Sequence, residues 1–169
     1  GLLNGKLGPN VSHHPPEDLR FGDQFVGEVF NALSANTTVW NKTLFVLLYD
    51  EHGGFHDHVV PPTCVATGST VDVPWKNPFT RLGVRVPAIL ASPWLKPGLI
   101  PWTGNVQAQH YDHTSLLAFL CDHFKLPRSA LGPRVIAAQH FGNAPIWRAA
   151  PGVTAAPTLA ATVVPSRAG

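Results

Sequence analysis

Residues 50–58, which read DEHGGFHDH, concentrate three carboxylates and three imidazoles in nine positions. Carboxylate oxygens are ligands for hard cations such as Ca²⁺, Mg²⁺ or Mn²⁺, and imidazoles suit Zn²⁺ or contacts to an anionic phosphate. Farther upstream, His13 and His14 stand before two prolines, whose fixed φ angles restrict the chain. Together these residue types indicate a site for a metal ion and an anion.

Asp50 and Glu51 are the strongest candidates for metal ligands because they directly follow an apolar run. Neighbouring residues of a strand point to opposite faces, so both carboxylates reach one ion only if the chain turns at once. The double glycine at 53–54 permits that turn. The same glycines disfavour a helix, which excludes a zinc-protease interpretation of His52 and His56 as a helical pair.

Simpler interpretations apply to most of these residues when each is taken alone. An isolated acidic pair at the end of a strand is usually a solvated turn, and a single histidine is usually a surface or hydrogen-bonded residue. Of the nine histidines, only His14, His52 and His58 are treated as candidates, because they lie within or beside further chemistry.

Several other functions lack the motif that each would need. The sequence contains no G-x-S-x-G nucleophile elbow, no G-x-x-x-x-G-K-[ST] phosphate loop and no G-x-G-x-x-G fingerprint. A net charge of +2 with scattered Lys and Arg gives no electrostatic footprint for nucleic acid. No apolar run approaches the roughly 20 residues of a transmembrane helix, and the first ten residues lack the pattern of a signal peptide.

The elements that must position these groups follow from the hydrophobic pattern. Residues 18–33 carry apolar side chains at four-residue steps and predict an amphipathic helix. Residues 43–50 form a short apolar run typical of a strand buried on both faces, and residues 85–93 form a second run. Residues 112–124 predict another helix, with its leucines on one apolar face and Asp112 as its N-cap. This order predicts an α/β fold with a mostly parallel sheet flanked by helices.

In such a fold, ligands bind beyond the carboxyl ends of the strands, where Asp50 and Glu51 stand. The helix over 18–33 should run antiparallel to the strand that follows it, which would carry His14 to the same edge of the sheet. Residues 92–93, at the end of the second strand, should lie at that edge as well. The sequence therefore predicts one site from residues that are far apart along the chain.

The remaining segments carry weaker signals. Residues 61–82 predict a long loop between two strands, of a length that is often functional. The Ala- and Pro-rich residues 149–169 predict a flexible tail, which leaves residues 1–148 as the folded part. Cys121 is expected to be a small buried hydrophobe on a helix. The surroundings of Cys64 and a disulfide between the two cysteines stay open.

Four blocks of the sequence resemble the bacterial phosphoesterase family that contains phospholipases C and an acid phosphatase, within the alkaline-phosphatase-like superfamily. The blocks follow the family's order and cover most of residues 12–134. Their sequences are HHPPEDLRFGDQFVGEVFNAL, WNKTLFVLLYDEHGGFHDHVVPP, RLGVRVPAILASPWLKPG and YDHTSLLAFLCDHFKLP. The second block departs from the family's usual wording by placing His56 where tyrosine is common.

The resemblance implies an alkaline-phosphatase-like fold and metal-dependent hydrolysis of phosphoric esters. It implies that Asp50 and Glu51 bind one catalytic divalent metal ion, whether Ca, Mg, Mn or Zn. His14 would contact the phosphate or the leaving group. A histidine can protonate a departing alcohol, so His14 and His58 are the candidate catalytic groups, and His14 and His52 are the candidate substrate contacts.

The same resemblance implies that the chain is the C-terminal portion of the enzyme. The family's Glu-Asn metal pair and its Ser or Thr nucleophile belong to motifs that this sequence lacks, and the chain has no Met and starts at Gly1. We expect a phospholipid or a simpler phosphate ester as substrate, and export from the cell. Asp112 and His113 match a family motif, in a helix-capping role or in the site. The alternative is a non-catalytic domain that keeps the metal loop to stabilise itself or to bind a partner.

Overall fold

The computed structural model describes residues 2–3, 6–7, 11–68, 79–98, 110–144, 146–152 and 158–161. They contain both helices and strands, as an α/β sequence predicts. The elements are β1 (Leu2–Leu3), β2 (Lys6–Leu7), α1 (Leu19–Ser34), α2 (Thr37–Trp40), β3 (Phe45–Leu48), β4 (Ala88–Ala91), α3 (His113–Phe124), η1 (Arg128–Leu131), α4 (Pro133–Ala137) and η2 (Phe141–Asn143).

The chain divides into two compact units, which are described separately. Unit 1 comprises Gly1–Leu47, Ala88–Leu95 and Arg148–Gly169, and unit 2 comprises Leu48–Pro87 and Lys96–Trp147. In unit 1, β1 and β2 form a small antiparallel pair. No helix among the described residues is long and apolar enough to cross a membrane.

Helix α1 begins where the sequence predicts, because Asp18 caps it. The Asp18 carboxylate accepts a hydrogen bond from the Arg20 backbone N–H at 3.0 Å and pairs with the Arg20 guanidinium at 2.6 Å. These hydrogen bonds lower the pKa of Asp18 to about 2. The buried residues of the helix are Gly22 and Phe30, whereas Phe25 of the predicted apolar stripe is exposed.

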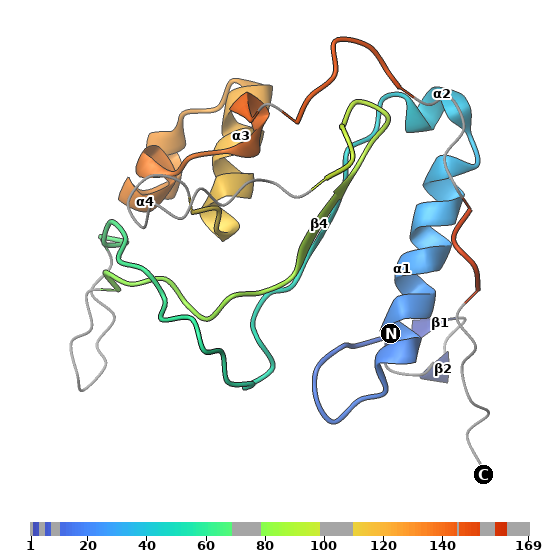
Figure 1. Ribbon diagram of the computed structural model, residues 1–169, viewed down its shortest axis with the longest axis horizontal. Coiled ribbons are helices and arrows are strands. Elements are labelled where there is room, and N and C mark those ends of the chain that lie inside the picture. The colour runs from blue at the N-terminus through green and yellow to red at the C-terminus, as the bar shows by residue number, and fades with distance from the viewer. Residues whose placement is uncertain are drawn as a thin grey trace. The chain divides into compact units, whose positions relative to one another are not determined.

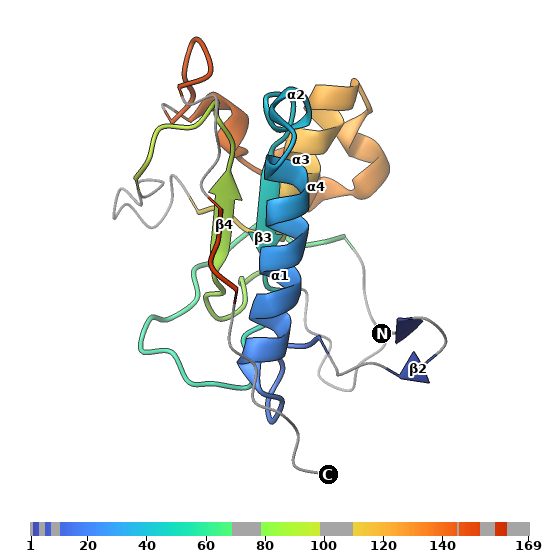
Figure 2. The same ribbon diagram turned by 90° about the vertical axis from the view of Figure 1, so that its right-hand side faces the viewer.

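Aromatic packing joins α1 to the elements that follow it. The Phe30 ring lies edge-on to Trp40 of α2, with ring centroids 5.2 Å apart, and edge-on to Phe45 of β3 at 5.5 Å. Figures 1 and 2 show α1 beside β3, with the chain running in opposite directions in the two elements. The predicted antiparallel packing of helix and strand is therefore present.

Strands β3 and β4 form a two-stranded sheet, and the contacts at its ends make it antiparallel. Tyr49, just after β3, donates its N–H to the carbonyl of Pro87, just before β4, at 3.2 Å. At the other end, Trp94 Nε1 donates to the carbonyl of Asn41 at 2.8 Å. The opposite course of the two strands is visible in Figure 1. The predicted parallel arrangement is wrong for this pair, and residues 92–93 lie near Asn41 rather than at the carboxyl end of β3.

The strands also differ from the prediction in burial. All four residues of β3 are half-buried, and Ile89 of β4 is 54% exposed. An apolar run specifies that a strand is suited to burial, but it does not specify the direction of its neighbour or what covers its faces. The alkaline-phosphatase-like superfamily stays a prediction.

The described part of the predicted tail makes contacts within unit 1. Leu159 exchanges two hydrogen bonds with the Asn31 side chain, at 2.9 and 3.0 Å. The N–H of Gly152 donates to the carbonyl of Pro93 at 2.9 Å. The flexibility predicted for residues 149–169 stays a prediction, and much of that range lies outside the described residues.

In unit 2, helix α3 starts at a capping box, as the sequence predicts for Asp112. Asp112 Oδ1 accepts from the Ser115 N–H at 3.2 Å, and Ser115 Oγ accepts from the Asp112 N–H at 3.0 Å. The buried face of the helix is made of small residues rather than of its leucines: Ser115, Ala118 and Cys121. Cys121 is buried as predicted, Cys64 is half-buried, and both thiols are free.

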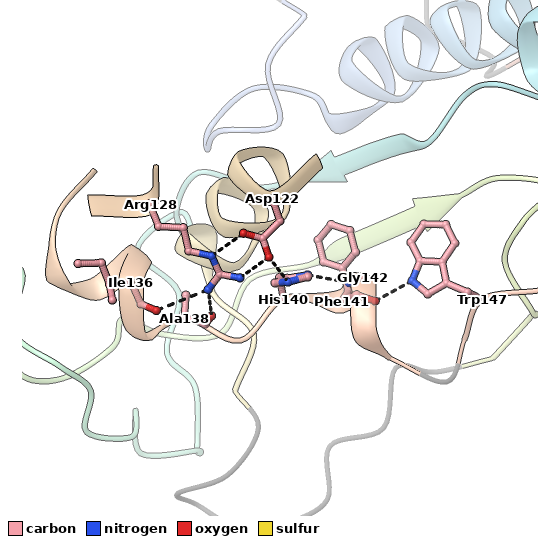
Figure 3. Close-up of polar contacts among 8 residues, drawn as sticks. All are labelled: Asp122, Arg128, Ile136, Ala138, His140, Phe141, Gly142 and Trp147. Carbon is pink, nitrogen blue, oxygen red and sulfur yellow. Dashed lines mark hydrogen bonds and ion pairs between the residues drawn. The ribbon is translucent and has the colours of Figure 1, made fainter. Parts of the chain in front are cut away.

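The end of α3 is fastened to the following segments by an acid, an arginine and a histidine (Figure 3). Asp122 accepts two hydrogen bonds from Arg128, at 2.8 and 2.6 Å. His140 Nε2 lies 2.8 Å from Asp122 Oδ2, which also accepts from Arg128 Nη2, while the Gly142 N–H donates to His140 Nδ1 at 3.1 Å. Because Nδ1 accepts, the proton of the neutral ring belongs on Nε2, where it is donated to Asp122.

Candidate functional site

The site loop, residues 50–58, belongs to unit 2, follows β3 closely along the chain and turns immediately. Gly53 and Gly54 have φ angles of 69° and 78°, in the left-handed region that a side chain disfavours. The N–H of Phe55 donates to the carbonyl of His52 at 3.3 Å, which closes the turn. The turn that the sequence requires after Asp50 and Glu51 is therefore present.

Asp50 and Glu51 are exposed, and each carboxylate accepts a hydrogen bond from the loop backbone. Asp50 Oδ1 accepts from the Glu51 N–H at 3.0 Å, and Glu51 Oε2 accepts from the Gly53 N–H at 2.8 Å. His52 Nδ1 lies 3.7 Å from Glu51 Oε2. The backbone of the loop thus orients both carboxylates.

The donor chemistry of this pair fits a hard divalent cation, since two adjacent carboxylates supply oxygen ligands. Within the described ranges, no group of three or more His, Cys, Asp or Glu side chains is placed to hold a metal ion. A metal ion at Asp50 and Glu51 would therefore need further ligands, from water or from protein groups beyond those described.

Asp57, at the end of the site loop, is an anchor. Its side chain is only 11% exposed, and it accepts hydrogen bonds from Arg85 Nε at 2.7 Å and Arg85 Nη2 at 2.8 Å. The Val59 N–H donates to Asp57 Oδ1 at 3.1 Å. The Arg85 hydrogen bonds, followed by the Val59 N–H, hold the pKa of Asp57 well below its usual range. The sequence alone gave no signal for this pair, because its partners are 28 positions apart.

The three candidate histidines have different surroundings. His58 is 85% exposed, with Nδ1 3.6 Å from Asp57 Oδ1, and His52 is 36% exposed beside Glu51. His14 belongs to unit 1, where its ring Nδ1 lies 2.6 Å from the carbonyl of Pro15. The approach of His14 to Asp50 and Glu51 stays a prediction, as do the roles of all three histidines.

Asp112 and His113, which share a motif, serve the local structure of unit 2. Asp112 caps α3, and His113 Nε2 lies 2.7 Å from the carbonyl of Tyr49, the residue before Asp50. His113 therefore fixes the entry to the site loop from the helix side. This positioning contact was not predicted from the sequence, although the motif had marked the residue.

The predicted loop over residues 61–82 has a paired stem. The N–H of Cys64 donates to the carbonyl of Thr80 at 2.7 Å, and Thr63 and Arg81 form an antiparallel bridge. Arg134 of α4 donates to carbonyls on both arms, at Val65 and Phe79. Residues 69–78 lie outside the described residues.

Comparisons with known proteins identify the family. Residues 5–127 match the Phosphoesterase family, a range that includes α1, the site loop, β4 and α3. The chain belongs to this family, and the resemblance seen in its four blocks is confirmed.

Its relatives are phospholipases C. The chain is 39% identical over 131 residues to non-specific phospholipase C6 of Arabidopsis thaliana, covering 75% of this chain and 25% of that protein. It is 37% identical over 137 residues to a non-hemolytic phospholipase C of Burkholderia pseudomallei, covering 73% and 19%. It is 38% identical over 130 residues to the hemolytic phospholipase C of Pseudomonas aeruginosa, covering 71% and 17%. The chain thus spans a quarter or less of each relative, and the relatives include plant as well as bacterial proteins.

Proposed function

We propose that this chain is the C-terminal part of a metal-dependent phosphoric ester hydrolase of the phospholipase C type. One observation carries the proposal: the site loop, with its adjacent carboxylates at the end of β3, lies inside the range that matches the Phosphoesterase family. The relatives named phospholipase C support a phospholipid or a related phosphate ester as the substrate. Export from the cell is part of the proposal and rests on family resemblance.

In this proposal, Asp50 and Glu51 hold one divalent metal ion through their exposed carboxylates. The bound ion would supply charge stabilisation to the phosphoryl oxygens and a lowered pKa for the attacking hydroxyl. His58, which is open to solvent, and His14 are the groups that donate a proton to the departing alcohol. His52 and His14 contact the phosphate. A nucleophile comes from another part of the enzyme.

Replacing either acidic ligand in the full-length protein tests the proposal. Asp50→Asn and Glu51→Gln should each reduce hydrolysis of a chromogenic phosphate ester to the background rate, because each removes a charged ligand. Thermal unfolding should change little, since both side chains are exposed. Glu28→Gln on α1 is the matched control, because Glu28 is also exposed and makes one hydrogen bond, from Gln24 at 2.9 Å. Unchanged turnover with stoichiometric metal in the Asp50 and Glu51 variants would remove both residues from the site.

The isolated 169-residue chain provides a second test. It should show no phosphoesterase activity above a metal-only control, because covalent or water-directed attack needs the nucleophile motif that this sequence lacks. It should also aggregate readily, because half-buried β3 and exposed Ile89 leave strand surface open to association. Robust metal-dependent turnover by the purified chain would contradict the assignment of the nucleophile to another part of the protein.

A further inference from the structure

The site loop is tied at both ends to one short segment of chain. At its start, the Tyr49 N–H donates to the carbonyl of Pro87 at 3.2 Å. At its far end, Asp57 forms its two-bond ion pair with Arg85, at 2.7 and 2.8 Å. Arg85 and Pro87 are two positions apart. Residues 50–56, here called the arch, are therefore flanked on both sides by residues that are hydrogen-bonded to the segment 85–87.

We propose that Arg85 and Asp57 are positioning residues that fix the geometry of the Asp50 and Glu51 carboxylates by closing this arch. The inference rests on the proposed function, since it assigns a role to the pair in the same metal site. Neither residue is proposed to touch metal or substrate. Their effect passes through the backbone of the loop.

The arch needs such a closure because its sequence favours disorder. Gly53 and Gly54 sit at its centre, and glycine loses more conformational freedom on ordering than any other residue. The hydrogen bonds that orient the two acidic side chains come from backbone N–H groups within the arch, on Glu51 and Gly53. Those bonds keep their directions only if the ends of the arch are held.

The burial of the Asp57 side chain makes its ion pair with Arg85 difficult to open. The Asp57 side chain is 11% exposed, whereas Arg85 is 62% exposed. A carboxylate largely removed from water requires a partner, so the loop stays closed as long as the arginine is in place. The geometry also requires arginine, because a guanidinium offers two parallel N–H bonds and an ammonium offers a point charge.

Arg85→Lys therefore tests the closure of the arch by itself, because it keeps the positive charge and removes the two parallel N–H bonds of the guanidinium. Arg128→Lys is the matched control: Arg128 forms the same kind of two-bond ion pair in the same unit, with Asp122 at 2.8 and 2.6 Å, but away from the site loop. Both variants are made in the full-length protein. Three quantities are measured for each: the Mn²⁺ dissociation constant by calorimetry, hydrogen exchange of the loop amides, and the melting temperature.

Arg85→Lys should weaken Mn²⁺ binding about tenfold, as loss of a group that orients metal ligands typically does. It should also speed exchange of the Glu51 and Gly53 amides, while its melting temperature falls no more than that of the control. Arg128→Lys should lower the melting temperature and leave Mn²⁺ affinity and loop exchange at wild-type values. If Arg85→Lys fails to fold, Asp57→Asn gives the same test, because the amide keeps the shape of the side chain and Arg85 is free to be solvated.

The outcomes separate this inference from the proposed function. If wild-type protein binds Mn²⁺, Asp50→Asn abolishes that binding, and Arg85→Lys changes neither affinity nor exchange, the closure is overturned and the proposed function stands. If wild-type protein binds none of Ca²⁺, Mg²⁺, Mn²⁺ and Zn²⁺ in the same calorimetric measurement, the proposed function fails. Faster loop exchange in Arg85→Lys than in Arg128→Lys would then still support the closure of the arch, and equal exchange would overturn it.

Discussion

Unit 2 contains two groups of an acid, an arginine and a histidine that share residue types and ion-pair geometry. In each, the carboxylate accepts two hydrogen bonds from the guanidinium, at 2.7 and 2.8 Å in one and at 2.8 and 2.6 Å in the other. The first, here called the loop group, is Asp57, Arg85 and His58. The second, the helix group, is Asp122, Arg128 and His140.

The two groups differ in which residue is buried: the acid in the loop group and the histidine in the helix group. In the loop group, Asp57 is 11% exposed and His58 is 85% exposed, with 3.6 Å between the nearest ring nitrogen and the carboxylate. In the helix group, Asp122 is 45% exposed and His140 is 9% exposed, at 2.8 Å. Burying the acid fixes a loop and leaves its histidine to solvent, whereas burying the histidine makes the ring part of the core.

The surroundings of His140 explain why it is structural. Both ring nitrogens have partners, Asp122 on one side and the Gly142 N–H on the other (Figure 3). Phe119 lies 6.1 Å from the His140 ring centroid and 4.6 Å from that of Phe141. A ring held in this way has no nitrogen to offer to a substrate, so the two groups share their residue types and their Asp–Arg ion pair but differ in the role of the histidine.

The largest effect that would test this comparison is expected for His140→Ala. Removal of a buried ring leaves a cavity among aromatic neighbours and should lower the free energy of unfolding by about 2 kcal/mol. Urea unfolding of the full-length protein, followed by tryptophan fluorescence, measures this change. Phosphoesterase activity of the folded fraction should equal that of wild type. A folded His140→Ala protein of normal stability but without activity would reverse the roles assigned to the two histidines.

The parts of the structure that the sequence predicted are those set by local contacts. Asp18 and Asp112 cap α1 and α3 through bonds to residues no more than three positions away. The turn after Asp50 depends on two adjacent glycines. Residue type and spacing are sufficient for such features, because capping and turn geometry repeat in any fold.

The parts that the sequence did not predict depend on distant partners. The direction of β4 beside β3 is not encoded in either apolar run, and the Asp57–Arg85 pair joins positions 28 apart. In α3, the spacing of leucines marked one face as apolar, yet the small residues around Ala118 are buried because they allow close approach of neighbouring segments. A periodic pattern identifies apolar faces without identifying what packs against them.

A smaller effect is expected when the acid of the helix group is titrated. The Arg128 hydrogen bonds, with a further contribution from His140, lower the pKa of Asp122 from 3.8 to about 2. A lowered folded-state pKa means that the ion pair stabilises the protein fully above pH 3.8 and that this stabilisation is lost as the pH falls through about 2. The melting temperature should therefore fall across this window.

Asp122→Asn identifies the source of that fall. The variant should have a lower melting temperature than wild type at pH 6 and a shallower decline between pH 4 and pH 2, because its amide does not titrate. Asp18→Asn is the comparison variant: the pKa of Asp18 is also lowered to about 2, by Arg20 of α1, so this variant should remove a separate part of the same decline. Parallel curves for Asp122→Asn and wild type would show that Asp122 does not contribute to the acid transition.

The smallest effect on stability is expected for His58→Ala, which is the counterpart of His140→Ala in the loop group. His58 is 85% exposed and stands 3.6 Å from a carboxylate that Arg85 already neutralises. Its removal should change the free energy of unfolding by less than about 0.5 kcal/mol, the usual range for surface substitutions.

In the proposed function, the same change should lower the maximal rate of phosphate ester hydrolysis by roughly 100-fold, as loss of a proton donor does. His56→Ala, which removes a neighbouring exposed histidine, is the control that should retain the rate. Equal activity in the His58 and His56 variants would leave the loop group with an anchoring role alone, and the proton donor would then have to be sought at His14.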